Sequence, residues 1–508
     1  MEWMVQLKPL EQGLVDRLKF GQAVTEEIAT RRNLLPPEPW LDAVRNNATL
    51  VAEWVKSRLL SGSPNAPGVV INARKFGHGI RPVPIIGIAE RIAYRALAKA
   101  ATKGIEFPLR SPEEYREFVH APITYAFEHV KGRRVRLGEA RIKYVVEADI
   151  TAFYQYVDHE LLKQELQMQT GEIDAANKLV ELLGEINDKS FGIPQLLDPS
   201  DWLSEAYIRI VERNLVRKGL MVWRFNDDFR IGCMDYRQAL WSLEQLAHAA
   251  REVGLVVGDH KTFTTLFFTY MFNYTDMGVD RLAAEFDPQD VEVAVTDYSD
   301  MDEADNVAWA LLTLQRTEQH PDHVGRIDLR GLQAREMRYL RRALGALTRN
   351  KDPRGIRFLT ELFRYVPALT PNILGYLVEV QDADREGTLA RWRELERYSV
   401  SDWQALWLTY AARKMGILQD NGHVRDWVTS NARGNTSEAL RAESYLALAS
   451  ASLTTFEDLD VGLRVAPDAL APWYVIGMKS LVGGPNAPTD KQLGAIRQSS
   501  PLFRALLK

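Results

Sequence analysis

The sequence predicts an α+β protein in which a small antiparallel sheet with its helices precedes a long, wholly helical segment. Residues 144–150 form a short β-rich run, and two further runs at 219–225 and 229–234 are separated by Asn226-Asp227-Asp228. Two β-rich runs joined by a short polar turn are typical of a hairpin. From about residue 285 to 508, apolar residues recur at three- and four-residue spacing between short Pro or Asn turns, which predicts a succession of helices.

The first domain, residues 1–145, is expected to combine N-terminal helices with a first pair of strands. Its predicted elements, in order, are helices within 14–32 and 41–60, a loop at 61–68, strands at 68–77 and 79–88, and a helix at 89–101. A proline-rich break, Leu-Pro-Pro-Glu-Pro, separates the two N-terminal helices.

The second domain, residues 146–280, is expected to hold the antiparallel sheet. After the strand at 144–150, its predicted elements are a helix at 157–169, two further helices broken near 191–194, the hairpin, and a helix at 241–254 that ends at Gly254. This order belongs to an α+β layout rather than to a doubly wound one. The third domain, residues 285–508, is typical of a HEAT-like α-solenoid, with an irregular helical domain as the alternative because no strict period is present.

Length and composition favour a cytoplasmic protein. With 508 residues the chain is too long for one hydrophobic core, so two or three domains are expected. Its one cysteine, Cys233, cannot form an internal disulfide, which fits a reducing compartment. The N-terminal residues lack the apolar core of a signal peptide, and no apolar run reaches 18 residues, so no membrane partner is expected.

The charge is unevenly distributed along the chain. The net charge is −5, which argues against a protein that binds duplex DNA by counterion release alone. Residues 1–145 hold 23 Lys and Arg against 15 Asp and Glu, a net of +8, whereas residues 146–280 hold 12 against 22, a net of −10. A basic segment followed by an acidic one suits a site that binds phosphates on one side and metal ions on the other.

Three aspartates stand where carboxylates are unusual. Asp149 ends an apolar strand, and Asp227 and Asp228 lie at the tip of the hairpin. Buried anions need a partner or a metal. If the hairpin lies beside the strand, the carboxylates converge and hold two Mg²⁺ ions, with Mn²⁺ as the alternative, about 3.5–4 Å apart for an in-line phosphoryl displacement. Taken singly, an Asp-Asp turn is more often a solvated loop.

Four stretches, in the correct order, resemble motifs A to D of reverse transcriptases. They are ADITAFYQYVDHELL (148–162), FGIPQLLDPSDWLSEAYI (191–208), WRFNDDFRI (223–231) and GLVVGDHKT (254–262). Upstream, KFGHGIRPVPIIGIAERIAYRAL (75–97) resembles the fingers motifs of bacterial reverse transcriptases. The resemblance implies reverse-transcriptase-like fingers and palm followed by the all-α, HEAT-like domain. That plan is similar to the abortive-infection (Abi) and related phage-defence reverse transcriptases.

The resemblance also implies roles for individual residues. Asp149, Asp227 and Asp228 would be the catalytic residues and, with the carbonyl of Ile150, the metal ligands. Tyr154 would be a steric gate against the 2′-hydroxyl, and Gln195 would contact the incoming nucleotide or the base opposite it. Lys261 would protonate the pyrophosphate. Lys75 and Arg81 would bind the triphosphate. From the residues alone, Tyr154 is equally an ordinary core aromatic, and the basic residues are equally solvated surface groups.

The implied activity is an antiphage DNA polymerase that adds dNTPs without a template and starts from a protein hydroxyl. Its partners would be dNTPs, a single-stranded DNA product attached covalently, and further copies of the chain in a homo-oligomer, in the cytoplasm of a bacterium, with a bacterial or prophage gene. Two departures from the motifs are present, since Leu196 replaces the Gly of motif B and Gly258 the Asn of motif D.

Three alternatives stay open. The first is a reverse transcriptase that copies RNA, using a dedicated noncoding RNA. The second is a nucleotide cyclase, which shares the palm plan but has a Gly-rich hairpin and needs no fingers. The third is an inactive polymerase that serves as a helical scaffold, against which the intact Asp149, Asp227 and Asp228 speak.

Overall fold

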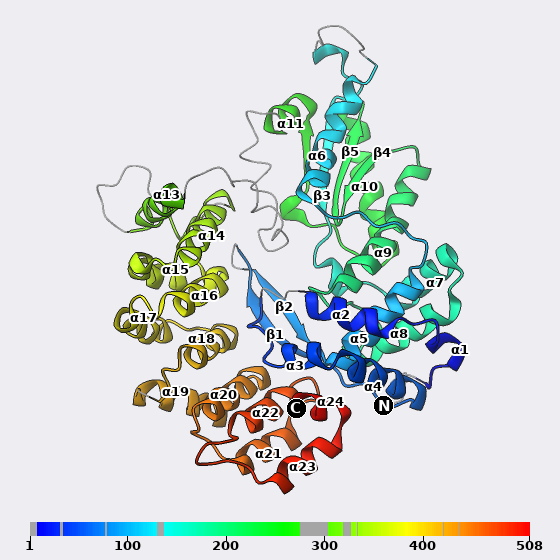
Figure 1. The fold of residues 1–508 in the computed structure, drawn as a ribbon. Coiled ribbons are helices and arrows are strands. Elements are labelled where there is room, and N and C mark those ends of the chain that lie inside the picture. Colours follow the sequence, from blue (N-terminus) through cyan, green and yellow to red (C-terminus); the bar gives the residue numbers. More distant parts are fainter. Residues whose placement is uncertain are drawn as a thin grey trace. The chain divides into compact units, whose positions relative to one another are not determined.

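The computed structural model describes most of the chain, namely residues 8–30, 34–76, 79–129, 137–274, 303–318, 327–332, 334–419, 421–434 and 436–508. The described part is an α+β protein that is mostly helical and holds two small sheets (Figure 1). The α+β class predicted from the sequence is therefore confirmed. The chain forms two compact units. One, the split unit, joins Pro9–Ala93 to Tyr298–Lys508, and the other, the four-stranded unit, comprises Tyr94–Asp297 together with Met1–Lys8.

The four-stranded unit is built on one antiparallel sheet. Its strands are β3 (Tyr144–Asp149), β4 (Met221–Phe225), β5 (Asp228–Cys233) and β6 (Phe263–Leu266), in the order β4-β5-β3-β6. Its helices are α6 (Pro112–Phe127), α7 (His159–Thr170), α8 (Ile173–Asn187), α9 (Asp198–Arg217), α10 (Tyr236–Glu252) and α11 (Phe267–Tyr274), with short 3-10 helices η2 (Leu137–Glu139), η3 (Phe153–Gln155) and η4 (Asp259–Lys261). The predicted strand, hairpin and helices are all present.

Helices cover both faces of this sheet. One face packs against α6 and α11 in an aromatic cluster that includes Tyr270, with Trp223 and Phe225 of β4 at its margin. Alternate residues of a strand point to opposite faces. Arg224, between these two aromatic residues, instead contacts Glu205 of α9, so α9 lies on the other face.

Local signals position the helix ends in this unit. The carboxylate of Asp158 accepts the Leu161 N–H at 2.8 Å and begins α7, and Asp235 caps α10 in the same way. Gly254, at φ +73°, follows α10, and the Leu255 N–H returns to the Ala250 carbonyl at 2.9 Å. Gly tolerates this left-handed conformation, which explains why the helix ends where the sequence predicts.

The split unit combines both ends of the chain. From the N-terminal stretch it takes α1 (Gln12–Val15), α2 (Phe20–Ala29), α3 (Leu41–Asn46), α4 (Ala48–Ser61) and the two-stranded sheet of β1 (Val69–Arg74) and β2 (Ile80–Ile85). From the C-terminal stretch it takes α13 (Glu303–Gln315), α14 (Ala334–Arg349), η6 (Pro353–Phe358), α15 (Leu359–Tyr365), η7 (Pro367–Leu369), α16 (Thr370–Val380), α17 (Arg385–Arg397), α18 (Asp402–Met415), α19 (Gly422–Arg433), α20 (Glu438–Ser450), α21 (Phe456–Val465), α22 (Ala471–Ser480), α23 (Asp490–Ser499) and α24 (Pro501–Leu506).

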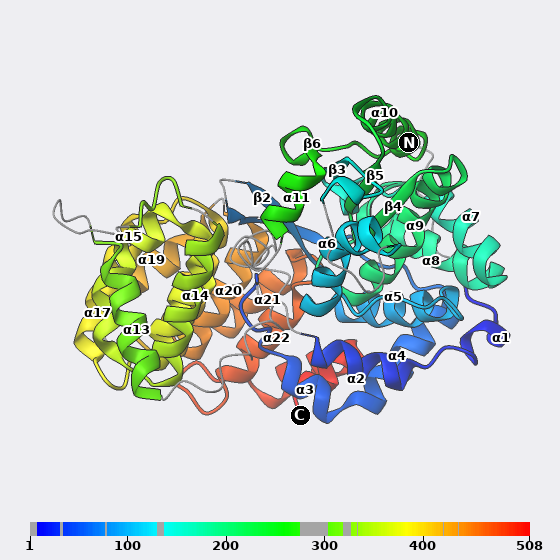
Figure 2. The same ribbon diagram turned by 90° about the horizontal axis from the view of Figure 1, so that it is seen from above.

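The C-terminal helices are stacked one on the next. From α13 the packing proceeds to α14, α16, α18, α20 and α22, while α17, α19 and α21 pack against members of this row. Figure 1 labels the helices of the row, and Figure 2 shows the same stack from above. The all-helical prediction for residues 285–508 therefore holds wherever the structure describes them, and the HEAT-like repeat stays a prediction. None of the described helices is long and apolar enough to cross a membrane.

The boundary between the units differs from the predicted domain boundaries. It falls after Ala93, inside α5 (Ile88–Ala101), so the predicted domain 1–145 is divided between the two units. The physical reason is non-local burial: α3 and α4 pack against α24, β1 packs against α18 and α20, and the rings of Trp40 and Trp473 meet edge to face with centroids 6.4 Å apart.

Candidate active site

Three carboxylates meet at one end of the four-stranded sheet. Asp149 is the last residue of β3, and the antiparallel register pairs it with Asp228, the first residue of β5. Asp227 precedes it in the turn between β4 and β5. One oxygen from each of the three carboxylates can be chosen so that all three lie within 4.8 Å of one another. The structure thus brings together the three aspartates predicted as metal ligands.

The hairpin turn is held by its own conformation and by its neighbour strand. Phe225 pairs with Asp228, which leaves Asn226 and Asp227 as a two-residue turn. Asn226 has φ +56°, a conformation that Asn adopts more readily than most residues. The Ile150 N–H donates to the Asp227 carbonyl at 3.2 Å, which directs the backbone of Ile150 toward the hairpin. The role of the Ile150 carbonyl as a metal ligand stays a prediction.

Like charges dominate the electrostatics of this cluster. Burial, together with the charges of Asp228 and Asp149, raises the pKa of Asp227 to about 8. Three carboxylates this close repel one another and are stabilised by a cation. Their oxygens are the ligands that hard divalent cations prefer, so the donor set fits Mg²⁺ or Mn²⁺.

Lys261 is the cationic partner of the cluster. It ends η4, and its Nζ lies 3.2 Å from Asp149 Oδ1. Partial burial would lower the pKa of Lys261, but the charges of Asp149, Asp228 and Asp227 outweigh it and raise that pKa. Lys261 is therefore a charged group beside the carboxylates, and its role as a proton donor to pyrophosphate stays a prediction.

Close packing explains why position 258 is a glycine. The Gly258 N–H donates to the Asp149 carbonyl at 2.7 Å. A Cβ atom at position 258 would lie 2.7 Å from Thr151 Oγ1 and 3.4 Å from Asp149 Oδ2. A side chain here would press on Thr151 and on Asp149 at the end of β3, so the close approach favours glycine.

Tyr154 lies in η3, and its hydroxyl is fully engaged. The hydroxyl donates to Asp201 Oδ1 and accepts a hydrogen bond from Arg110 at 2.8 Å. Burial, followed by the charge of Asp201, raises the pKa of Tyr154. The ring is therefore held in one position as a neutral phenol, which a steric gate requires.

The loop that carries Gln195 is tied to the loop that carries Tyr154. The Ile193 N–H donates to the Tyr154 carbonyl at 2.8 Å, and the Gly192 N–H donates to the Val157 carbonyl at 2.7 Å. Gln195 follows this anchor and is half-buried. Leu196 has φ +64°, the left-handed conformation that favours glycine. Leu196 thus holds a backbone conformation typical of glycine, at the position where the resemblance to motif B leads us to expect one.

The residues after Leu196 have structural partners. Asp198 begins α9 and pairs with the buried Arg95 at 2.9 Å. Ser200, which is fully buried, shares a hydrogen bond of 2.8 Å with the Tyr94 hydroxyl. Both contacts join α9 to the C-terminal half of α5, so Asp198 and Ser200 support the fold.

The remaining predicted site residues lie in the split unit. Arg81 is part of β2, where it pairs with Ala73, and Lys75 directly follows β1. The structure therefore places seven predicted site residues in the four-stranded unit, namely Asp149, Ile150, Tyr154, Gln195, Asp227, Asp228 and Lys261. Triphosphate binding by Lys75 and Arg81 stays a prediction.

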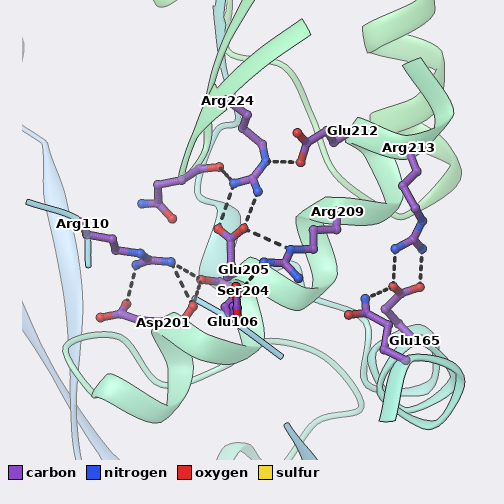
Figure 3. A network of polar contacts seen from close by, with 12 residues as sticks. Glu106, Arg110, Glu165, Asp201, Ser204, Glu205, Arg209, Glu212, Arg213 and Arg224 are labelled. Atoms are coloured by element: carbon purple, nitrogen blue, oxygen red, sulfur yellow. Dashed lines mark hydrogen bonds and ion pairs between the residues drawn. The ribbon is translucent and has the colours of Figure 1, made fainter. Parts of the chain in front are cut away.

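Sequence reasoning did not identify the charged residues that support the site. Glu147 and Arg230 form a cross-strand pair next to Asp149 and Asp228, with 3.3 Å between Glu147 Oε2 and an Arg230 nitrogen. A charged residue inside the apolar run 144–148 was a signal for this pair. Arg224 was visible only as one residue of WRFNDDFRI, and Asp201 and Glu205 only as residues of FGIPQLLDPSDWLSEAYI. Nothing in the sequence marked Arg110, which Figure 3 shows in contact with Asp201.

We expect the metal-free protein to lose stability as the pH rises. The pKa of Asp227 is about 8 in the folded protein and about 3.9 in an unfolded chain. Between these values the folded state binds more protons than the unfolded state, so the free energy of unfolding falls as pH rises toward 8. Thermal melts in EDTA at pH 6 and pH 8.5 measure this, and Mg²⁺ should raise Tm more at pH 8.5, by at least roughly 2–4 °C. An equally steep pH dependence in Asp227→Asn would contradict the assignment.

Tyr154→Ala is expected to admit ribonucleotides. Removal of the ring leaves space for a 2′-hydroxyl, so the ratio of rNTP to dNTP incorporation should rise by at least about tenfold. Tyr156→Ala, which removes an exposed tyrosine two residues away, is the matched control. An unchanged ratio in an active Tyr154→Ala protein would place the gate elsewhere.

No protein-family model matches the chain, and no curated protein matches it significantly.

Proposed function

We propose that this protein is a nucleotidyltransferase, namely a DNA polymerase of the reverse-transcriptase kind that uses two divalent metal ions. The observation that carries the proposal is the convergence of Asp149, Asp227 and Asp228 at the end of a strand and the tip of its neighbouring hairpin. Lys261 beside them and the engaged hydroxyl of Tyr154 add support. The fingers and palm assignment, and the likeness to phage-defence reverse transcriptases, belong to the same proposal.

Each residue would act through its position in this site. Asp149, Asp227 and Asp228 would hold Mg²⁺, which lowers the pKa of the attacking hydroxyl and neutralises the leaving pyrophosphate when bound. Lys261, a protonated amine at Asp149, would donate a proton to the pyrophosphate. Tyr154 would exclude the 2′-hydroxyl and so select dNTPs.

The direct test is incorporation by the purified protein alone. Radiolabelled dNTPs are incubated with the protein and Mg²⁺ and the products are separated on a gel. Label that migrates as polymer supports the proposal. An absence of polymer with Mg²⁺ and with Mn²⁺, with and without added primer and template, would overturn it.

We further propose that synthesis needs no template. Leu196 carries this part, because a half-buried side chain stands where motif B has Gly and where close approach of a templating base needs an open backbone. The alternative is RNA-templated synthesis on a dedicated noncoding RNA. The test uses purified protein whose absorbance ratio shows that it carries no nucleic acid. Only a template-independent polymerase would incorporate dNTPs in that sample.

The cellular role that fits this activity is defence against phage. We propose that the protein acts as a homo-oligomer in this role. The test is survival of an infected culture that expresses the wild-type protein or Asp149→Asn. Protection that persists in the Asp149→Asn protein would contradict a defence that depends on polymerisation.

The DNA product is expected to be covalently attached to the protein. A site without a docked primer still needs a hydroxyl at the metal, and a side chain of the same chain supplies one at high effective concentration. Tyr is the expected donor because its phenol is the most acidic hydroxyl side chain. The chain has 18 tyrosines and none before Tyr94. Labelled product is denatured and treated with protease or DNase, and label that migrates as free DNA before protease would contradict attachment.

A further inference from the structure

Helix α9 carries a row of charged and polar residues on one side. Asp201, Ser204, Glu205, Arg209 and Glu212 recur at three- and four-residue spacing. Figure 3 shows Asp201 and Ser204 in contact with Arg110, Glu205 and Glu212 in contact with Arg224, and Arg209 in contact with Glu205. Residues at this spacing lie one above another on a helix, about 5.4 Å apart per turn. Two of them, Asp201 and Glu205, reach the site from adjacent turns.

Asp201 holds the hydroxyl of Tyr154. It accepts the hydrogen bond from Tyr154, while Arg110 donates to the same phenol at 2.8 Å and forms an ion pair with Asp201, also at 2.8 Å. Arg110 is fastened in turn, because it donates to Ser204 Oγ at 3.0 Å and to the Asp201 carbonyl at 2.9 Å. The phenol is thus bound from two directions, and rotation of the ring away from α9 would break both bonds.

Glu205 holds the hairpin that carries Asp227. Its two oxygens accept hydrogen bonds from both terminal nitrogens of Arg224, and both side chains are almost fully buried. Arg224 NH1 also donates to the Asn226 carbonyl in the turn, at 2.9 Å. Because the Ile150 N–H binds the next carbonyl, that of Asp227, both peptide oxygens of the turn are fixed.

This arrangement depends on the direction of the Arg224 guanidinium. Burial would raise the pKa of Glu205, but the hydrogen bonds and charge of Arg224 outweigh it and lower that pKa, so the pair is ionised. A bidentate ion pair holds a planar guanidinium in one orientation. The Nε–H of Arg224 donates to Glu212 at 3.0 Å, which fixes the third side of the guanidinium. In this orientation Nη1 also donates to the Asn226 carbonyl.

We propose that Asp201 and Glu205 are positioning residues with separate effects: Asp201 sets sugar selection through Tyr154, and Glu205 sets metal affinity through Arg224 and the turn at Asp227. This inference rests on the proposed function. Helix α9 would thereby hold the ring of Tyr154 and the carboxylate of Asp227 in fixed positions relative to each other. If the turn is loosened, the carboxylate of Asp227 moves and binds the metal more weakly. In other proteins, too, removal of a residue that holds a metal ligand in place weakens metal binding.

The experiment compares Asp201→Ala, Glu205→Gln and a matched control, Glu165→Gln. Glu165 is also buried and also forms a bidentate pair with an arginine of α9, Arg213, at 2.6 and 2.7 Å, but it contacts no predicted site residue. Three quantities are measured for each protein: the ratio of rNTP to dNTP incorporation, the Mg²⁺ concentration at half-maximal rate, and the affinity for Mn²⁺ by calorimetry without nucleotide.

Asp201→Ala is expected to raise the rNTP to dNTP ratio about tenfold and leave Mn²⁺ affinity unchanged, because a hydrogen bond to a charged group is lost. Asp201→Asn, which keeps an acceptor oxygen for Tyr154, should restore part of the selectivity. Glu205→Gln is expected to weaken Mn²⁺ binding and raise the half-maximal Mg²⁺ concentration about tenfold, with the ratio unchanged. Glu165→Gln should change neither quantity.

Equal behaviour of Glu205→Gln and Glu165→Gln, or an unchanged ratio in an active Asp201→Ala protein, would overturn the proposal. If Glu205→Gln does not fold, Arg224→Lys replaces it, because lysine keeps the positive charge beside Glu205 but lacks the planar, forked guanidinium that binds Glu205 and the Asn226 carbonyl together. Wild-type protein that makes no product would count against the proposed function, whereas Mn²⁺ calorimetry would still test the role of Glu205 at the metal carboxylates.

Discussion

Asp149→Asn and Asp227→Asn are each expected to reduce nucleotide incorporation by at least about 10³-fold while the protein stays folded. Each change removes one negative charge from a cluster whose oxygens lie within 4.8 Å of one another. Loss of a charged ligand weakens the metal that stabilises the transferring phosphoryl group, and several kcal/mol of that stabilisation correspond to this loss in rate. The measurement is single-turnover incorporation of labelled dNTP at saturating Mg²⁺.

The fold is expected to tolerate both changes. Burial, followed by repulsion from Asp228 and Asp149, raises the pKa of Asp227, so a neutral amide there should leave Tm unchanged or slightly higher in EDTA. Asp174→Asn makes the same chemical change at an exposed position of α8 and is the matched control. Retained synthesis in either variant, with Tm unchanged, would refute the assignment of these carboxylates.

Removal of residues 285–508 is expected to abolish activity and to leave a fragment that does not fold completely. The split unit combines Pro9–Ala93 with Tyr298–Lys508, so the truncation takes away the surfaces on which the N-terminal helices are buried. Trp40 is almost fully buried and packs against Trp473, while the indole N–H groups of Trp403 and Trp407 donate to the Leu34 carbonyl at 2.6 and 3.2 Å. Exposing such a core costs several kcal/mol per large aromatic side chain, roughly 3–5 for each Trp.

The measurements are soluble yield, circular dichroism and dNTP incorporation of the fragment 1–284. Co-expression of residues 285–508 as a separate chain is the control, because it restores the buried surfaces without the covalent connection. A soluble 1–284 fragment with the activity of the whole chain would contradict a structural requirement for the C-terminal helices.

The single substitution Trp473→Ala tests the same contact within the whole chain. Loss of this buried indole should lower Tm and should leave the metal affinity of the four-stranded unit unchanged. A loss of metal affinity at unchanged Tm would instead connect this residue to the site.

Local patterns predict the strand and the hairpin that carry the three aspartates, while the pairing that brings them together was a condition that the structure met. An apolar run that ends in Asp149, and two runs joined by a polar pair of residues, determine a strand and a hairpin within a few residues each. Antiparallel pairing then brings Asp149 opposite Asp228, because side chains in register on neighbouring strands lie about 4.5–5.5 Å apart. Gly254 at the end of α10 was equally predictable, since a positive φ has few alternatives to glycine.

Only the tertiary structure decided what holds these residues in place. Arg110 and Asp201 are 44 and 47 residues from Tyr154 in sequence. Arg224 lies in β4 and its partner Glu205 lies in α9, so this ion pair also joins two different elements. The union of Pro9–Ala93 with Tyr298–Lys508 is equally non-local, and it divides the N-terminal domain that the sequence predicts. The physical reason is that turns and helical or strand periodicity depend on residues that are neighbours in sequence. A buried ion pair or a shared core depends instead on which distant surfaces come together. A charged or apolar residue has the same local pattern whatever its partner is.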